Sequence, residues 1–252
     1  MLSTDSLYTP FKPASGARLR LFCFPYAGGG SSIFHAWSRG LPPEIQVCTV
    51  QLPGRENRLL EPPFCRITPL VEKLAAVLMP HMDIPFAFFG HSMGALIGFE
   101  LARELRRLNR PGPGLLAVSA YRAPQLPLLS PPIHQLSEPE FLKQLSLRYD
   151  AIPSAIAEDR ELMKLFASVL KADLAVIETY VYSRDEPLAC PISAFGGLTD
   201  RQVPREDLSA WRSQTQDSFK VRMVPGHHFF LNGSRSIVLQ AMVEDLSALH
   251  AV

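Results

Sequence analysis

Gly90-His91-Ser92-Met93-Gly94 is the most informative local pattern in the chain. It fits the motif G-x-S-x-G, in which a serine stands on a sharp turn between a strand and a helix. Residues 85–89 form a short apolar run typical of a buried strand, and residues 95–105 carry apolar side chains at helical spacing. The glycines fit because only small residues can lie beside so tight a turn. The pattern therefore predicts a nucleophilic serine, exposed above a sheet at a helix N-terminus.

Short apolar runs alternate with helical patterns along the rest of the chain. Strands are expected near residues 19–24, 46–51, 115–119, 192–195 and 219–224, and helices near 70–79, 160–182 and 236–249. Strands that alternate with helices are typical of a mostly parallel sheet covered by helices. Together with the serine turn, this order predicts the α/β class and the α/β-hydrolase fold.

One stretch, residues 123–186, breaks this alternation because none of its segments has the pattern of a strand. A proline-rich opening leads into helical patterns, the first of which begins near Ser137. A helical insertion between two core strands predicts a lid that sequesters substrate and excludes water, with an ordinary pair of packing helices as the alternative. We expect one domain over residues 1–252, with its core at about 15–122 and 187–252 and its lid at about 123–186.

The composition argues against several other classes of protein. Of the 252 residues, 47% are hydrophobic, and the net charge of +1 gives no reason to expect nucleic acid or a membrane surface as partner. The N-terminal residues lack the basic and apolar regions of a signal peptide, and no apolar stretch is long enough to span a bilayer. The four cysteines include no C-x-x-C pair, so we expect no zinc site or disulfide framework. Cys23, Cys48 and Cys190 lie in or beside apolar runs and are expected to be buried thiols in the cytoplasm.

A serine hydroxyl needs a base to take its proton, and that base is most often a histidine. The doublet His227-His228 follows the last expected strand, so either imidazole would lie at the sheet edge from which Ser92 emerges. The pattern alone leaves the choice within the doublet open. His91, inside the turn itself, is expected to pack beside it, and the other histidines have no companion acid.

The acid of a catalytic triad should lie between the serine and the histidine in the chain. Asp200 follows a strand end and a glycine turn, and it is therefore the expected acid. Its competitors, Glu206 and Asp207, have the position of first-turn helix residues that the helix macrodipole stabilises.

Two backbone N–H groups are expected to form an oxyanion hole. One belongs to Met93, the residue after the nucleophile, and the other to the glycine-rich segment 24–30, where Ala27 is the first choice and Tyr26 the second. Glycines there let the backbone approach a reacting carbonyl. A phosphate-binding loop is disfavoured, because no Gly-Lys-Ser/Thr follows and the spacing differs from G-x-G-x-x-G.

With these residues in place, the chain resembles the type II thioesterases, the stand-alone editing hydrolases that accompany nonribosomal peptide and polyketide synthases. The resemblance covers nearly the whole chain. It rests on residues 24–29 (FPYAGG), 51–56 (QLPGRE), 90–95 (GHSMGA), 122–124 (RAP), 178–180 (ETY) and 228–231 (HFFL).

The resemblance implies that His228 is the base, since family members usually have a glycine at the position of His227. It also implies Asp200 as the acid and a substrate held as an acyl thioester on the phosphopantetheine arm of an acyl or peptidyl carrier protein. Enzymes of this family clear stalled or misprimed acyl groups in antibiotic or siderophore biosynthesis. A monomer without metal or diffusible cofactor is implied as well. Residues 148–150 (RYD) depart from a glycine pair frequent in the family, so lid flexibility and acyl preference do not carry over.

Three other functions share parts of this pattern. They are a general carboxylesterase or lipase-like hydrolase, an acyltransferase that uses the same acyl-serine, and a non-catalytic scaffold. The complete set of triad residues disfavours the scaffold.

For carrier recognition, Arg55, Arg58 and Arg122 follow strands on the active-site edge and are candidates to meet the phosphopantetheine phosphate. The arginines at positions 103–110 lie at the far end of their helix, and we interpret them as a solvated face.

Overall fold

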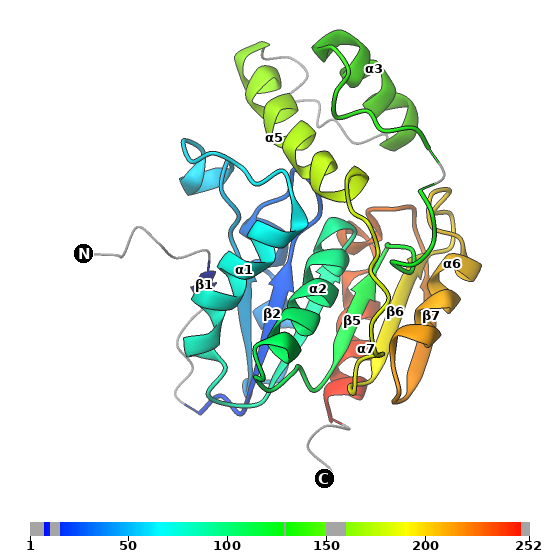
Figure 1. Ribbon diagram of the computed structural model, residues 1–252. Coiled ribbons are helices and arrows are strands. Elements are labelled where there is room, and N and C mark those ends of the chain that lie inside the picture. Colours follow the sequence, from blue (N-terminus) through cyan, green and yellow to red (C-terminus); the bar gives the residue numbers. More distant parts are fainter. Residues whose placement is uncertain (1–7, 11–15, 129, 150–159, 248–252) are drawn as a thin grey trace.

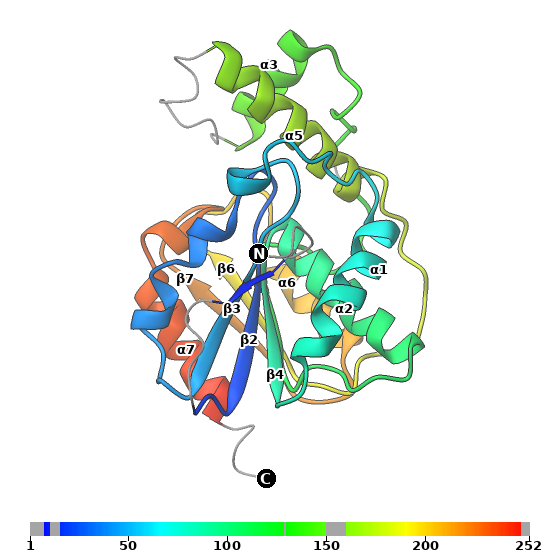
Figure 2. The ribbon, with the colours of Figure 1, turned by 90° about the vertical axis from the view of Figure 1, so that its left-hand side faces the viewer.

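A computed structural model describes residues 8–10, 16–128, 130–149 and 160–247 of the chain. Its centre is a seven-stranded sheet with the strand order β1-β3-β2-β4-β5-β6-β7 (Figures 1 and 2). The strands are β1 (Tyr8–Pro10), β2 (Leu19–Phe24), β3 (Ile45–Val50), β4 (Phe86–His91), β5 (Leu116–Ser119), β6 (Ile192–Gly197) and β7 (Phe219–Val224). The pairs from β3 to β7 are parallel, which confirms the mostly parallel sheet predicted from the sequence.

Helices cover both faces of the sheet (Figure 2). On one face lie α1 (Ile67–Leu78), α2 (Met93–Arg107) and α6 (Arg205–Ser209), and on the other lies α7 (Arg235–Ser247). Short 3-10 helices complete the chain: η1 (Ser31–Phe34), η2 (Trp37–Arg39), η3 (Glu56–Arg58), η4 (Met79–His81), η5 (Ala210–Gln214) and η6 (Phe230–Asn232). Each face buries its own apolar core, one around Trp211 and the other around Trp37. Because both faces are covered, the central strands are continuous apolar runs.

Two further helices follow β5 and precede β6 in the chain, α3 (Glu138–Tyr149) and α5 (Arg160–Glu178). We call them the helical insertion. They lie above the carboxyl edge of the sheet (Figure 1). A separate apolar cluster holds them together, with Phe141 and Leu145 from α3 packed against Leu170 and Leu174 from α5. The helices expected in this region are therefore present, and α5 ends four residues before the expected boundary at 182.

The strand β1 was not expected from the sequence. It has three residues, pairs antiparallel with β3 at the edge of the sheet, and ends in Pro10. A proline is tolerated there because an edge strand has one side without ladder hydrogen bonds. The thiols of Cys23, Cys48 and Cys190 are free and buried, as predicted, and Cys65 is free and exposed.

Candidate active site

Ser92 occupies the turn between β4 and α2, and its backbone angles are φ 53° and ψ −117°. A residue with a side chain rarely adopts this conformation, so the turn stores strain at the nucleophile. A Cβ atom on Gly94 would overlap the carbonyl oxygen of Phe24, and one on Gly90 would overlap the backbone of Gly94. Close packing thus requires both glycines. The strand, turn and helix predicted around Ser92 are all present.

The imidazole of His228 lies between Ser92 and Asp200. Its Nε2 is 3.1 Å from Ser92 Oγ, and its Nδ1 is 2.9 Å from Asp200 Oδ2. The other carboxylate oxygen, Oδ1, accepts hydrogen bonds from the backbone N–H groups of Gln202 and Val203, at 2.8 and 3.3 Å. Since the Asp200 side chain is fully buried, these contacts fix its orientation toward the imidazole. The arrangement has the geometry of a nucleophile, a base and an orienting acid.

The other candidates for the base and the acid take no part in the two hydrogen bonds that join Ser92, His228 and Asp200. His227 is exposed, and its Nδ1 accepts a hydrogen bond from the Phe229 N–H at 3.3 Å. Glu206 and Asp207 belong to the first turn of α6, as the sequence suggested. The residues brought together around Ser92 are therefore His228 and Asp200.

The glycine loop, residues 26–30, lies beside the serine. Ala27 lines the same cavity as Ser92 and His228. Met93 is the first residue of α2, and the first N–H groups of a helix have no partner within it. Gly28 has φ +77°, a conformation that favours glycine, and the Gly29 N–H closes a tight turn on the Tyr26 carbonyl at 2.9 Å. Ala27 and Met93 thus both lie close to Ser92, and the role of their N–H groups as oxyanion donors stays a prediction.

One contact at the site was not predicted. His91 is fully buried, with Nε2 2.9 Å from the carbonyl oxygen of His228 and Nδ1 2.8 Å from Ser119 Oγ. A carbonyl oxygen only accepts hydrogen bonds, so the proton of the His91 ring is on Nε2, and Nδ1 accepts from the Ser119 hydroxyl. Burial, with the nearby His228 adding to it, lowers the pKa of His91 well below its usual value. The neutral ring of His91 therefore links the turn around Ser92 to the backbone of His228, whose side chain faces Ser92.

A cavity of about 360 Å³ opens over Ser92 and His228. Much of its apolar wall comes from the helical insertion, where Leu145, Leu170 and Leu174 face it. A partly exposed serine beside an apolar chamber suits an acyl group whose carbonyl lies at the serine.

The family model for the thioesterase domain matches residues 19–248. The chain belongs to this thioesterase family. The gramicidin S biosynthesis protein GrsT of Aneurinibacillus migulanus is 46% identical over 92% of this chain and 90% of its own length.

Solved structures agree with this result. The RedJ thioesterase from the prodiginine pathway of Streptomyces coelicolor is 40% identical and covers 93% of this chain and 92% of its own, with a TM-score of 0.85. The type II thioesterase BorB from the borrelidin biosynthetic cluster is 33% identical and covers 96% and 98%, with a TM-score of 0.86. The predicted α/β-hydrolase fold and hydrolase chemistry are thereby confirmed.

The arginines considered for phosphate binding are engaged within the thioesterase. Arg55 is buried, with 6% of its side chain exposed, and it pairs with Asp173 of α5 at 2.7 Å. The idea that it meets a phosphate is therefore wrong. Arg58 pairs with Glu61, and the Arg122 guanidinium donates to a nearby backbone carbonyl.

The arginines of α2 also differ from the prediction in part. Arg103 is buried rather than solvated, and it pairs with Glu100 at 2.7 Å and donates to the Ser183 carbonyl at 2.6 Å. Arg106 pairs with Asp185 at 2.7 Å. These contacts join the end of α2 to the chain segment that enters β6.

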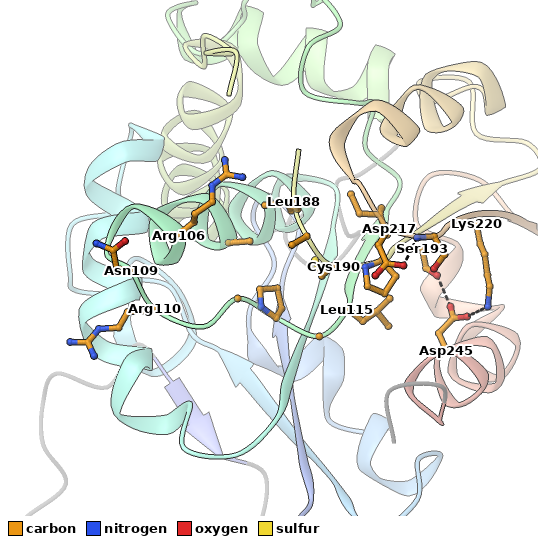
Figure 3. Close-up of a pocket in the computed structure, with 18 residues that line it drawn as sticks. Arg106, Asn109, Arg110, Leu115, Leu188, Cys190, Ser193, Asp217, Lys220 and Asp245 are labelled. Atoms are coloured by element: carbon orange, nitrogen blue, oxygen red, sulfur yellow. Dashed lines mark hydrogen bonds and ion pairs between the residues drawn. The ribbon is translucent and has the colours of Figure 1, made fainter. Parts of the chain in front are cut away.

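A larger cavity, of about 860 Å³, lies at the opposite edge of the thioesterase sheet (Figure 3). Arg106 and Arg110 stand on one side of it and Lys220 and Asp245 on the other. The carboxylate of Asp245 is already paired with Lys220 at 2.7 Å, and also with Arg222. No histidine is among the described residues that line this cavity. The predicted nucleophile and base, Ser92 and His228, line the smaller cavity instead.

The described residues contain no group of three or more histidine, cysteine or acidic side chains placed to hold a metal ion. None of the described helices is both long and apolar enough to cross a membrane.

Proposed function

We propose that this thioesterase hydrolyses acyl groups from the phosphopantetheine arm of acyl or peptidyl carrier proteins. Ser92 is the nucleophile, His228 the general base and Asp200 the orienting acid. The observation that carries the proposal is the chain of contacts from Ser92 Oγ through the His228 ring to Asp200, at 3.1 and 2.9 Å, at the mouth of an apolar cavity. Relatives named for gramicidin S, prodiginine and borrelidin biosynthesis support the role in such pathways.

In the first half of the reaction, Ser92 Oγ attacks the thioester carbonyl carbon while His228 Nε2 takes the hydroxyl proton. Asp200 Oδ2 accepts the Nδ1–H bond and stabilises the imidazolium. The N–H groups of Met93 and Ala27 hold the oxyanion. The tetrahedral intermediate collapses with cleavage of the C–S bond, and the imidazolium gives its proton to the leaving sulfur. The carrier leaves as a free thiol, and the acyl group stays on Ser92 as an ester.

In the second half, water replaces the thiol. His228 takes a proton from the water molecule, whose oxygen attacks the ester carbonyl. The second tetrahedral intermediate collapses with cleavage of its bond to Ser92 Oγ, His228 Nε2 returns the proton to that oxygen, and a carboxylic acid is released. A thiol, with a pKa of about 8.5, leaves far more readily than an amine, which suits release of thioesters held on a carrier. Removal of stalled or misprimed acyl groups is the role that this reaction serves.

The remaining features of the proposal concern the whole enzyme. It is a monomeric single domain, in which the helical insertion acts as a lid over the cavity. Four free thiols, three of them buried, suit a reducing compartment such as the cytoplasm.

The test compares hydrolysis of one acyl group presented on a carrier protein, on free pantetheine, on coenzyme A and as a p-nitrophenyl ester. We expect kcat/KM to be highest for the carrier-bound thioester, and Ser92→Ala to abolish turnover and labelling by a fluorophosphonate. Equal kcat/KM for the p-nitrophenyl ester would instead indicate a general esterase. Transfer of the acyl group to an added alcohol or amine in place of water would indicate an acyltransferase.

A further inference from the structure

A buried carboxylate of the helical insertion, Asp173 of α5, makes a hydrogen bond to the glycine loop. Its Oδ2 accepts a hydrogen bond from the Gly28 backbone N–H at 2.7 Å. The Asp173 side chain is 3% exposed, and buried neighbours on α5 such as Leu170 and Leu174 are apolar. An acidic group is rarely buried among apolar side chains unless it is paired and hydrogen-bonded.

The partner of Asp173 is Arg55, which follows β3. Its Nη1 and Nη2 donate to the two carboxylate oxygens at 2.7 and 2.8 Å, which is a bidentate pair. The same guanidinium donates to the carbonyl oxygens of Gly29 and Pro53, both at 3.2 Å. The glycine loop is therefore held from two sides, by the carboxylate at Gly28 N–H and by the guanidinium at Gly29 C=O.

Apolar contacts reinforce this connection. Phe166 and Leu170 precede Asp173 on α5 by seven and three residues, so all three lie on one side of the helix. A Cβ atom on Gly28 would lie 3.0 Å from a Leu170 methyl carbon and 3.3 Å from the Phe166 ring. The loop thus packs against α5 without space for a side chain. Figures 1 and 2 both show α5 directly above the loops that follow β2 and β3.

This contact acts next to the reacting atoms. Gly28 N–H belongs to the peptide group that follows Ala27. The Tyr26 carbonyl, which accepts from Gly29 N–H at 2.9 Å, belongs to the planar peptide group that carries the Ala27 N–H. Holding both peptide groups restricts the direction of the Ala27 N–H. A lone carboxylate one residue from the oxyanion site would oppose the negative charge that develops there. The guanidinium of Arg55 neutralises it, so that Asp173 orients the loop without that penalty.

We propose that Asp173 is a positioning residue for the oxyanion hole, and that α5 is thereby a fixed part of the active site rather than only a cover over it. The inference rests on the proposed role of the Ala27 N–H. It predicts that the carboxylate controls the stability of the tetrahedral intermediate more than the binding of the substrate.

The decisive variant replaces the pair by apolar groups of similar volume, Arg55→Met together with Asp173→Leu. Such replacement of a buried ion pair often leaves stability unchanged or raises it, so the fold should persist. Loss of one oxyanion donor lowers kcat by about 10²–10³-fold in other hydrolases, and a misplaced donor should cost about 10–100-fold. We expect that loss in kcat for a p-nitrophenyl ester, with KM changed less than about threefold.

Two further variants separate positioning from general support. Arg55→Lys keeps a cation beside Asp173 but loses the bidentate pair. Because the carboxylate still accepts from the Gly28 N–H, kcat should stay within about fivefold. Lys171→Met removes a contact inside the helical insertion, from Lys171 Nζ to the Leu136 carbonyl, without touching the loop, and should leave kcat unchanged. Should the double variant not fold, Asp173→Asn replaces it in the comparison.

An acyl trifluoromethyl ketone supplies a second readout, because its adduct with Ser92 places an oxyanion in the hole. Its affinity should fall in parallel with kcat in the Asp173 variants and stay unchanged in Lys171→Met. Wild-type kcat or wild-type ketone affinity in the double variant would overturn the inference, as would a loss confined to KM. Failure of the ketone to form an adduct at Ser92 in the wild-type enzyme would instead contradict the proposed function itself.

Discussion

The buried imidazole of His91 makes the stability of this thioesterase depend on pH in a way that can be measured. Its Nε2–H donates to the His228 carbonyl and its Nδ1 accepts from the Ser119 hydroxyl, so both ring nitrogens of the neutral imidazole are satisfied in a fully buried site. Burial accordingly lowers the pKa of His91 in the folded state. In the unfolded chain the pKa of histidine is about 6.5.

The sign and size of the effect follow from proton linkage. Below about pH 6.5 the unfolded state binds a proton that the folded state does not, so the stabilisation is present above this pH and is lost as the pH falls. With no proton taken up by the folded imidazole, the free energy of unfolding falls by about 1.4 kcal/mol between pH 7.5 and pH 5.5 on account of His91.

Urea unfolding of the wild type and of His91→Gln at these two pH values measures this contribution. The stability gap between the two proteins should shrink by about 1.4 kcal/mol at the lower pH, because glutamine does not titrate. Ser119→Ala is the matched control: it removes a hydrogen bond to the ring, at a cost of about 1–3 kcal/mol, but leaves the imidazole buried, so its gap should be similar at both pH values. A gap between wild type and His91→Gln that does not change with pH would refute the reasoning, since it would mean that the folded state protonates His91.

Other predictions concern the triad and the turn. Asp200→Asn should lower kcat by about 10⁴-fold through the wrong imidazole tautomer, measured with a p-nitrophenyl ester, and a loss below about tenfold would indicate another acid. His228→Ala should lose nearly all of that activity and His227→Ala should keep most of it; the opposite result would reverse the assignment. Gly94→Ala should destabilise the fold by about 1–3 kcal/mol in urea unfolding, because its methyl group would overlap the Phe24 carbonyl, and a neutral effect would contradict the packing of the turn.

Much of the site could be predicted because each triad residue lies in a recognisable local sequence pattern, and the topology of the sheet brings these residues together. Ser92 has a motif and a strand-turn-helix context, and Asp200 and His228 each follow a strand. The carboxyl ends of parallel strands lie at one edge of the sheet, so residues predicted to follow these strands are also predicted to lie close to one another. The His227-His228 doublet shows the limit of such reasoning: both residues follow β7, and only the fold places one ring against the serine and the other in solvent.

The parts that escaped prediction depend on contacts between distant segments. β1 is too short to show a period and is defined by its pairing with β3. Arg55 and Asp173 are 118 residues apart, and no local pattern joins them. A signal for Asp173 did exist, since it lies among the apolar residues of α5 and an acid in that position requires a partner. The sequence does not say which arginine provides it.

The features of the site that could be predicted and those that could not lie in different parts of the molecule, at the carboxyl edge of the sheet and in the helical insertion. In the proposed mechanism, bonds are made and broken by residues at strand ends and at the start of α2, positions that the sheet fixes and that motifs reveal. The apolar wall of the cavity over Ser92 includes Leu145, Leu170 and Leu174 of the helical insertion, whose helices pack through their own apolar cluster. Many apolar sequences would satisfy that packing equally well. The apolar pattern of the insertion therefore predicts that it lines a cavity but not the shape of that cavity. The reaction type is therefore predicted from local motifs, whereas we expect acyl preference to depend on the shape of the cavity that the insertion lines.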